Sequence, residues 1–197
     1  FNAYLSAIEQ LGNLERPADM PAPSISIKLS ALHPRYESHN RAQVMEQLGD
    51  SIAQLVSKAK SLDVAVTIDA EEADRLDLSL DLFEALAMDP VFAGWDGLGF
   101  VVQAYQKRAP AVLDRVAAVA RRHGRRIPVR LVKGAYWDYE VVHARQHGYP
   151  CPVFTDKAAT DAQYEQLTDF LLYHIDDLHP AFGSHNLRSL THALTLA

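Results

Sequence analysis

The sequence predicts an α/β fold of parallel strands joined by helices and, within that class, an incomplete (β/α)8 barrel. Strand-like and helix-like segments alternate along the chain, without the short turn signals of β-hairpins. In residues 24–30, Ile25, Ile27 and Leu29 face one way, whereas Lys28 and three serines face the other. A doubly wound sheet would need both faces apolar, so this alternation favours a barrel whose apolar face is covered by helices.

The first elements follow from composition and helical spacing. We expect an N-terminal helix and a proline-rich connector over 1–23, and the barrel over 24–197. The first barrel strand is expected over 24–31, followed by a helix over about 40–62. The apolar face of that helix consists of Val44, Leu48, Ile52, Leu55, Val56 and Ala59.

The rest of the chain repeats the strand–helix pattern. Further strands are expected over 64–70, 98–105, 127–136, 152–155 and 181–186. Helices are expected around 78–87, through Val112, Val116 and Val119, from near Asp138, through Tyr164, Leu167, Phe170 and Leu171, and after Asn186. Asp138 is expected to cap its helix. The basic run 121–126 is expected to end another helix, with Gly124 in the left-handed capping conformation.

The two ends of the sequence predict that it is a piece of a longer protein. Phe1 is not an initiator residue, and the chain stops in "SLTHALTLA" as if inside a helix. We therefore expect the first and last strands of the barrel to lie outside this sequence.

Composition narrows the class of protein. With 48% apolar and 22% charged residues, the chain is typical of a soluble globular domain. Its net charge of -6 argues against a nucleic-acid surface, so we expect this segment to contact no nucleic acid. Cys151 is the one cysteine, which excludes an intrachain disulfide and favours a reducing compartment. The sequence has no apolar run of the roughly 20 residues that a membrane-spanning helix needs, while peripheral membrane contact stays open.

Polar residues gather where the expected strands end. They are Lys28, Asp69 with Glu71 and Glu72, Gln103, Arg130 with Lys133, Tyr136 and Trp137, Thr155, and His185 with Asn186. Any one of them has a structural explanation: Lys28 could pair with Asp69, and His185 could be a helix-cap residue. Because the carboxyl ends of barrel strands form one mouth, polar residues on every strand favour a functional site there.

The residue types indicate what this site would bind. Lys28 suits an anion clamp or a Schiff-base amine, and Gln103 can bond to a heteroaromatic carbonyl or ring nitrogen. Arg130 can place positive charge beside an electron-accepting ring, and Trp137 can stack on a flat group. A metal site is not expected, because His185 is the one histidine candidate.

Six segments resemble the proline dehydrogenase domain of bacterial proline utilization A, in the same order. They are "SISIKLSALHPRYE", "IDAEEADRLDLSLDLFEAL", "GLGFVVQAYQKR", "RLVKGAYWDYE", "PVFTDK" and "SHN". The resemblance runs from about Tyr4 to the end of the chain. It implies a distorted (β/α)8 barrel that holds non-covalent FAD, oxidises L-proline to Δ1-pyrroline-5-carboxylate and passes electrons to membrane quinone.

The resemblance also implies roles for individual residues. Lys28 would meet the proline carboxylate with Asp69 beside it, Arg130 would lie near the hydride-accepting nitrogen, and Tyr136 would wall the proline pocket. These four are the expected catalytic residues. The expected cofactor-binding residues are Asp69, Gln103, Arg130, Val132, Lys133, Gly134, Ala135, Trp137, Thr155, Lys157, Ser184, His185 and Asn186. Ser184 stands where the family often has threonine, and the change keeps the hydroxyl.

The resemblance extends to the expected context of the chain. It implies an aldehyde dehydrogenase domain in the same full-length polypeptide and a cytoplasmic location with peripheral association with the inner membrane. The family's last strand and helix carry a tyrosine and a pair of carboxylate-binding arginines, which would follow Ala197. We therefore expect this sequence alone to have little activity.

Two other functions stay open at this point. A Schiff-base lyase or aldolase could use Lys28 or Lys133, but that function leaves Gln103, Arg130 and Trp137 without a shared role. A barrel that serves as an inactive interaction or scaffold module is the non-enzymatic alternative.

Overall fold

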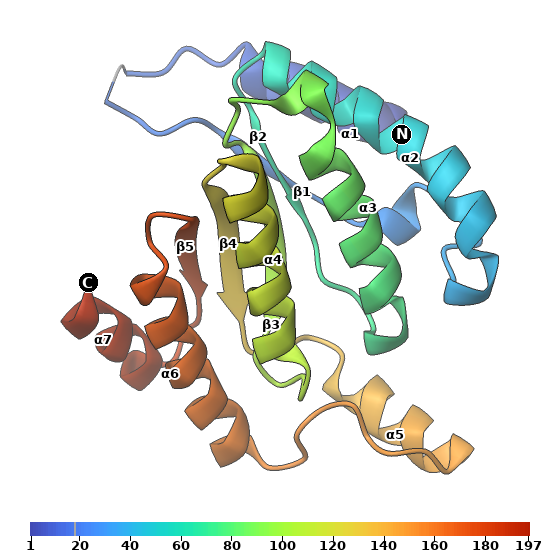
Figure 1. Ribbon diagram of the computed structural model, residues 1–197, viewed down its shortest axis with the longest axis vertical. Helices are drawn as coiled ribbons and strands as arrows, with labels where there is room; N and C mark the ends of the chain where they lie inside the picture. The colour runs from blue at the N-terminus through green and yellow to red at the C-terminus, as the bar shows by residue number, and fades with distance from the viewer. Residues whose placement is uncertain (18) are drawn as a thin grey trace. The chain divides into compact units, whose positions relative to one another are not determined.

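A computed structural model describes residues 1–17 and 19–197. The strands form a sheet in the order β1-β2-β3-β4-β5 (Figure 1). Their bounds are β1 (Ser24–Ile27), β2 (Ala65–Ile68), β3 (Leu98–Gln103), β4 (Ile127–Val132) and β5 (Leu178–Gly183). β1 pairs with β2, β2 with β3 and β4 with β5, each time in parallel. The predicted α/β class with parallel strands is therefore confirmed.

The chain divides into two compact units. The first consists of Phe1–Asp69 and Asp74–Phe100, and the second of Ala70–Ala73 and Val101–Ala197. β3 begins in the first unit and ends in the second. We describe each unit by itself.

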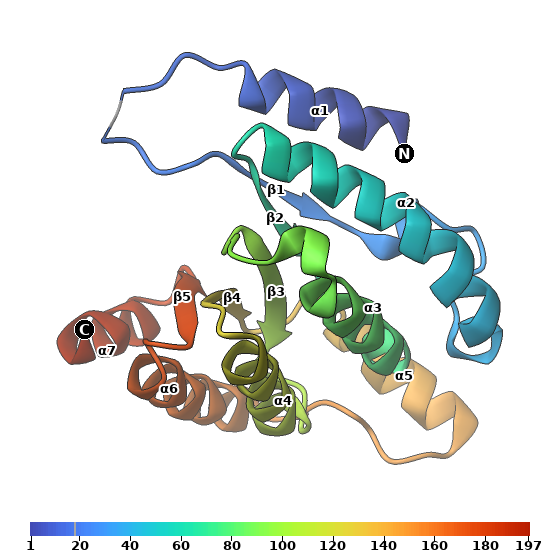
Figure 2. The same cartoon turned by 45° about the horizontal axis from the view of Figure 1, so that its top comes forward.

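Three helices belong to the first unit, and α1 and α2 lie side by side in it (Figure 2). The helices are α1 (Asn2–Gly12), α2 (Arg41–Ser61) and α3 (Leu76–Met88). All six predicted apolar residues of α2 are buried, as the helical spacing requires. Ile8 of α1 is fully buried, and Glu9 of α1 pairs with Lys58 of α2 at 3.0 Å.

Four helices belong to the second unit. They are α4 (Ala109–His123), α5 (Trp137–His147), α6 (Lys157–Tyr173) and α7 (Leu187–Leu196). α4 ends at Gly124, whose φ of +57° is left-handed, so the predicted cap is confirmed. α7 is joined to α6 by a bidentate bond from Arg188 to Glu165, at 2.6 and 3.0 Å.

Several predicted boundaries are wrong. Residues 152–155 form no strand. Their one antiparallel bridge joins Val153 to Gln106, because this short segment lies alongside the turn after β3 and does not enter the sheet. The strand expected over 181–186 begins earlier, at Leu178, and ends at Gly183. The first strand stops at Ile27, since a 3-10 helix (Leu29–Ala31) follows it.

Three further 3-10 helices lie between the main elements, at Ser38–Asn40, Ala73–Arg75 and Pro90–Phe92. In the parts of the chain that the structure describes, we find no helix both long and apolar enough to cross a membrane.

Candidate functional site

Lys28 and Asp69 lie at the carboxyl ends of two neighbouring strands in the first unit. Lys28 directly follows β1 and Asp69 directly follows β2, whose last residues Ile27 and Ile68 are paired. The Asp69 backbone N–H donates to the Ile27 carbonyl at 2.9 Å, and the Lys28 backbone N–H donates to the Tyr4 hydroxyl at 3.1 Å. The structure therefore places the two predicted residues at one level of the sheet, as the sequence predicts.

Arg130 lies on the less buried face of β4 in the second unit. Ile127, Val129 and Leu131 are at most 1% exposed, whereas Arg130 and Val132 on the alternate face are half-buried. This strand shows the same kind of alternation that the sequence predicts for residues 24–30. The guanidinium therefore lies on the face that is not packed into the core.

Gln103 ends β3 and is 3% exposed. Its Nε2 donates to the Glu71 carbonyl at 2.9 Å, and its Oε1 accepts from the Ala135 backbone N–H at 3.2 Å. An amide carries a second donor hydrogen and a second lone pair, so these two bonds do not exhaust its capacity. In the structure, the side chain fixes the backbone that follows β4.

Tyr105 shapes the same loop. The Tyr105 hydroxyl accepts from the Tyr136 backbone N–H at 3.1 Å, and the Tyr105 backbone N–H donates to the Lys133 carbonyl at 2.8 Å. Burial raises the pKa of Tyr105 well above its ordinary value, so the phenol stays protonated at neutral pH. The loop turns at Gly134, whose φ is +138°, and a Cβ there would lie 2.5 Å from the Tyr105 ring.

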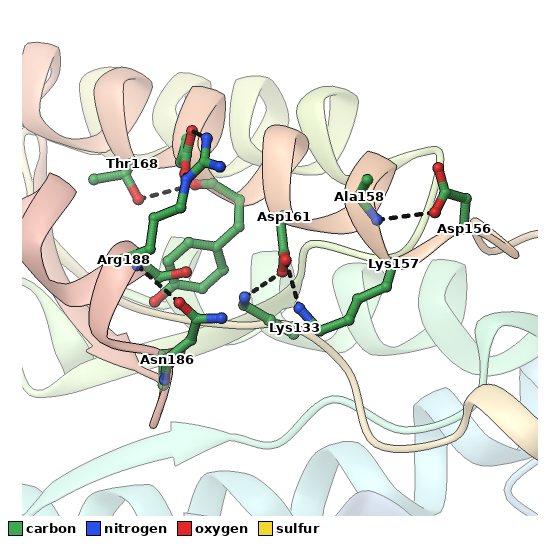
Figure 3. Close-up of polar contacts among 12 residues, drawn as sticks. Lys133, Asp156, Lys157, Ala158, Asp161, Thr168, Asn186 and Arg188 are labelled. Atoms are coloured by element: carbon green, nitrogen blue, oxygen red, sulfur yellow. Dashed lines mark hydrogen bonds and ion pairs between the residues drawn. The ribbon is translucent and has the colours of Figure 1, made fainter.

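Asp161 of α6 binds two of the predicted lysines at once (Figure 3). Lys133 comes from the end of β4, and Lys157 begins α6 and contacts Asp161 at 2.5 Å. The hydrogen bonds from Lys133 and then Lys157 lower the pKa of Asp161, so its carboxylate is ionised at neutral pH. The Lys133 ammonium also lies 5.5 Å from the centre of the buried Tyr164 ring, within cation–π range.

These residues border a pocket of about 310 Å³ in the second unit. Its lining residues are Tyr105, Lys133, Gly134, Trp137, Phe154, Thr155, Lys157 and Thr160. Trp137 is 44% exposed, and its Nε1–H donates to the Phe154 carbonyl at 2.9 Å, which holds the indole at the pocket. The volume lies at the lower end of the range for small-molecule and cofactor sites.

The sequence predicted five of the lining residues, and the structure brings them together: Lys133, Gly134, Trp137, Thr155 and Lys157. It missed Tyr105, Phe154 and Thr160, and also Asp161, which orients the two lysines. The available signal was that Tyr105 ends the strand expected over 98–105, because residues at the carboxyl ends of parallel strands form the mouth of the sheet.

The other predicted residues do not line this pocket. Arg130, Val132, Ala135 and Tyr136 flank it along the chain, and Ser184, His185 and Asn186 follow β5. Ser184 accepts from the Asn186 backbone N–H at 3.1 Å, and the Asn186 side chain caps α7 by accepting from Ser189 (Figure 3). Asn186, and not the exposed His185, is the N-cap of α7, so the helix-cap explanation for His185 does not hold.

Asp138 is not the cap of α5. The helix begins at Trp137 after Tyr136, which makes no side-chain capping bond. Asp138 lies in the first turn, where a carboxylate still interacts favourably with the helix dipole. The prediction was wrong by two residues because the loop before α5 is fixed by Gln103 and Tyr105 and not by a cap.

A family model for proline dehydrogenase matches residues 1–197. The chain belongs to the proline dehydrogenase family. Bifunctional protein PutA from Klebsiella aerogenes is 45% identical over 197 residues, covering 99% of this chain and 15% of that protein. PutA from Rhizobium meliloti is 48% identical over 191 residues, covering 96% and 15%. Human hydroxyproline dehydrogenase is 27% identical over 186 residues, covering 91% and 39%.

Solved proline utilization A structures agree with this assignment. PutA from Bradyrhizobium japonicum superposes with a TM-score of 0.96 at 48% identity, covering all of this chain and 20% of that one. PutA from Bdellovibrio bacteriovorus, inactivated by N-propargylglycine, gives 0.94 at 31% identity, covering 100% and 22%. The resemblance to proline utilization A is therefore confirmed, and this chain spans about 15% of the length of its bacterial curated relatives.

Proposed function

We propose that this chain forms the flavin-binding part of a proline dehydrogenase that oxidises L-proline to Δ1-pyrroline-5-carboxylate. The observation that carries the proposal is the pocket of the second unit, in a chain matched over its whole length by a family of flavoenzymes. Five of the residues that the sequence assigns to a cofactor meet at this pocket.

The donor set of the pocket fits part of FAD. Tyr105, Trp137 and Phe154 give it aromatic walls for a flat or apolar group. The ammonium groups of Lys133 and Lys157 suit an anionic group such as the diphosphate. Thr155 adds a hydroxyl, and Gly134 leaves room where a Cβ would collide with Tyr105, so a ligand can approach the backbone closely.

We assign the chemical roles as follows. When bound, FAD accepts the hydride taken from the substrate. Lys28 holds the proline carboxylate, and Asp69 on the next strand keeps the positive charge of Lys28 in place. Arg130 places a fixed positive charge where the cofactor ring becomes electron-rich, and Tyr136 closes the proline pocket. Much of the barrier to hydride transfer is positioning, so a clamp on the substrate carboxylate and a fixed charge near the cofactor ring are the contributions expected to lower it.

We assign the remaining predicted residues to the cofactor. Gln103 retains a donor and an acceptor for the flavin ring beyond its two backbone bonds. Val132 and Ala135 flank the same ring along the loop. Ser184, His185 and Asn186, which follow β5, serve the ribityl and adenosine end, where the exposed imidazole of His185 is available.

The strand order supports a (β/α)8 barrel as the finer fold. Neighbouring strands in space are consecutive in sequence, whereas a doubly wound sheet reverses its order at a switch point. We propose that the whole protein completes the barrel, carries an aldehyde dehydrogenase domain and passes electrons to quinone. Its proposed location is the cytoplasm, with peripheral attachment to the inner membrane.

The lyase alternative is disfavoured by the surroundings of Lys133. A Schiff-base lysine must reach its neutral form to attack a carbonyl. The Asp161 carboxylate already binds the Nζ of Lys133 in an ion pair, so this amine is not free to attack a carbonyl. Only Lys28 remains for that chemistry.

Anaerobic reduction of the bound flavin by proline tests the proposal in the whole protein. We expect proline to bleach the flavin absorbance, and Arg130→Met to slow the reduction about 100-fold because a preorganised charge is lost. Arg122→Met is the matched control, since Arg122 is exposed in the last turn of α4, and it should reduce at the wild-type rate. A wild-type flavin that proline does not bleach would contradict the proposal, and borohydride trapping of a carbonyl substrate on Lys28 would replace it with the lyase.

A further inference from the structure

The end of α5 carries a cluster of aromatic rings that the proposed function does not use. We call His143 and His147 the histidine pair; they lie on successive turns of α5 with ring centres 4.3 Å apart. Tyr139 stacks on His143 at 5.1 Å, and Tyr149 lies 5.6 Å from His143 and 5.8 Å from His147. None of these four residues lines the pocket.

The hydrogen bonds of the pair orient both imidazoles. The Nδ1–H of His147 donates to the His143 carbonyl at 2.9 Å, because a carbonyl can only accept. This fixes the tautomer of His147 and leaves its Nε2 with a free lone pair. Nδ1 of His143 is bound to the Tyr149 hydroxyl at 2.5 Å. Among residues 1–17 and 19–197, neither Nε2 has a hydrogen-bond partner.

Solvent can reach the pair. His147 and Tyr149 are exposed and His143 is half-buried. Arg145, the cation between them in the sequence, lies two residues from each, and residues two apart do not share a helix face. The Nε2 atoms are therefore not screened by this guanidinium.

We propose that the histidine pair binds a divalent transition-metal ion of the zinc, copper or nickel type through its two Nε2 atoms. Histidines at i and i+4 on a helix reach one ion, and imidazole nitrogen suits these metals. Ligating histidines usually have their other nitrogen hydrogen-bonded; here Nδ1 of His147 is bound to a carbonyl and Nδ1 of His143 to the Tyr149 hydroxyl, and an ion on Nε2 of His143 requires that its Nδ1–H donates to this hydroxyl. Water completes the coordination, since the site is open. The proposal does not depend on proline oxidation.

Copper(II) binding to the untagged whole protein tests the site. We expect one strong Cu2+ per chain, with nitrogen couplings from two imidazoles in its electron paramagnetic resonance spectrum. His147→Gln should weaken this binding about 100-fold, because the second ligand no longer acts at high effective concentration. Tyr149→Phe should weaken it about tenfold by releasing Nδ1 of His143.

A matched control keeps the composition and charge of α5. The swap Arg145→His with His147→Arg retains two histidines but separates them by two residues, on different faces. It should lose the strong site, and Zn2+ should raise the melting temperature of the wild type but not of the swap. Equal Cu2+ affinity in the wild type and His147→Gln would overturn the proposal, even if the swap failed to fold.

Discussion

Gly134→Ala tests the idea that the loop after β4 is shaped by Tyr105. At φ +138° an alanine is strained by about 1–3 kcal/mol. Its Cβ would also lie 2.5 Å from three carbons of the Tyr105 ring, and overpacking of this kind costs about 1–3 kcal/mol. Because Tyr105 is 3% exposed, the ring has little room to move away. We expect local destabilisation of about 2–6 kcal/mol.

Hydrogen exchange in the whole protein measures this effect locally, without unfolding other domains. A loss of 2 kcal/mol in local stability corresponds to about thirty-fold faster exchange in peptides covering 127–140. The Tyr136 N–H should respond most, because displacement of the ring removes its acceptor, the Tyr105 hydroxyl.

Gly148→Ala is the matched control. Gly148 also has a positive φ, +69°, but a Cβ there meets nothing within 4 Å. Gly148→Ala should therefore lower local stability only by the left-handed backbone strain, about 1–2 kcal/mol. Tyr105→Leu should reduce the cost of Gly134→Ala by about 1–3 kcal/mol, because the ring that causes the clash is gone. Exchange rates in Gly134→Ala no faster than in Gly148→Ala would refute the reasoning.

Two further predictions concern residues of α6. Tyr164→Phe should stabilise the protein by about 1 kcal/mol in thermal unfolding, because the buried Tyr164 hydroxyl has no hydrogen-bond partner in the described residues. Burial raises the pKa of Tyr164 to about 12, so above pH 10 the tyrosine ionises in the unfolded state but not in the folded state. This ionisation destabilises the wild type, so the stability advantage of Tyr164→Phe should grow above pH 10. A variant less stable than the wild type would contradict this prediction. Asp161→Asn should lower the free energy of unfolding by about 1 kcal/mol at pH 7, measured by thermal unfolding, because it removes the ion pairs of a partly exposed carboxylate with two lysines. Because the pKa of Asp161 is lowered in the folded state, this stabilisation is fully present above the pKa of the unfolded state, about 4, and is lost as the pH falls through the lower pKa of the folded state. The unfolding stabilities of the two proteins should therefore converge below about pH 4.

Local periodicity was sufficient to predict the helices and most strands. The apolar face of α2 follows from helical spacing alone, and the cap of α4 follows from one glycine after a basic run. Residues 152–155 show where this fails, because an apolar run becomes a strand only if a partner strand is available. Pro152, Val153 and Phe154 pair instead with the turn beyond β3, and their sequence does not encode that partner.

The candidate site was predictable in part from the positions of polar and aromatic residues at the ends of expected strands. Lys133, Trp137 and Thr155 were found in this way, whereas Gly134 and Lys157 were implied only by the family resemblance, and all five line one pocket. Asp161 was missed because it lies within a helix, near its start, where a carboxylate ordinarily faces solvent. Only the fold shows that two lysines from different elements converge on it.

Tyr105 shows why charge-based reasoning finds only part of a site. Its hydroxyl fixes the start of α5 through Tyr136, its ring excludes any side chain at Gly134, and its face lines the pocket. Because its phenol stays protonated, it contributes shape and one hydrogen-bond acceptor, and no charge. A residue of this kind determines where Lys133 and Trp137 can stand, so its loss should rearrange the charged residues of the pocket although it carries none of their chemistry.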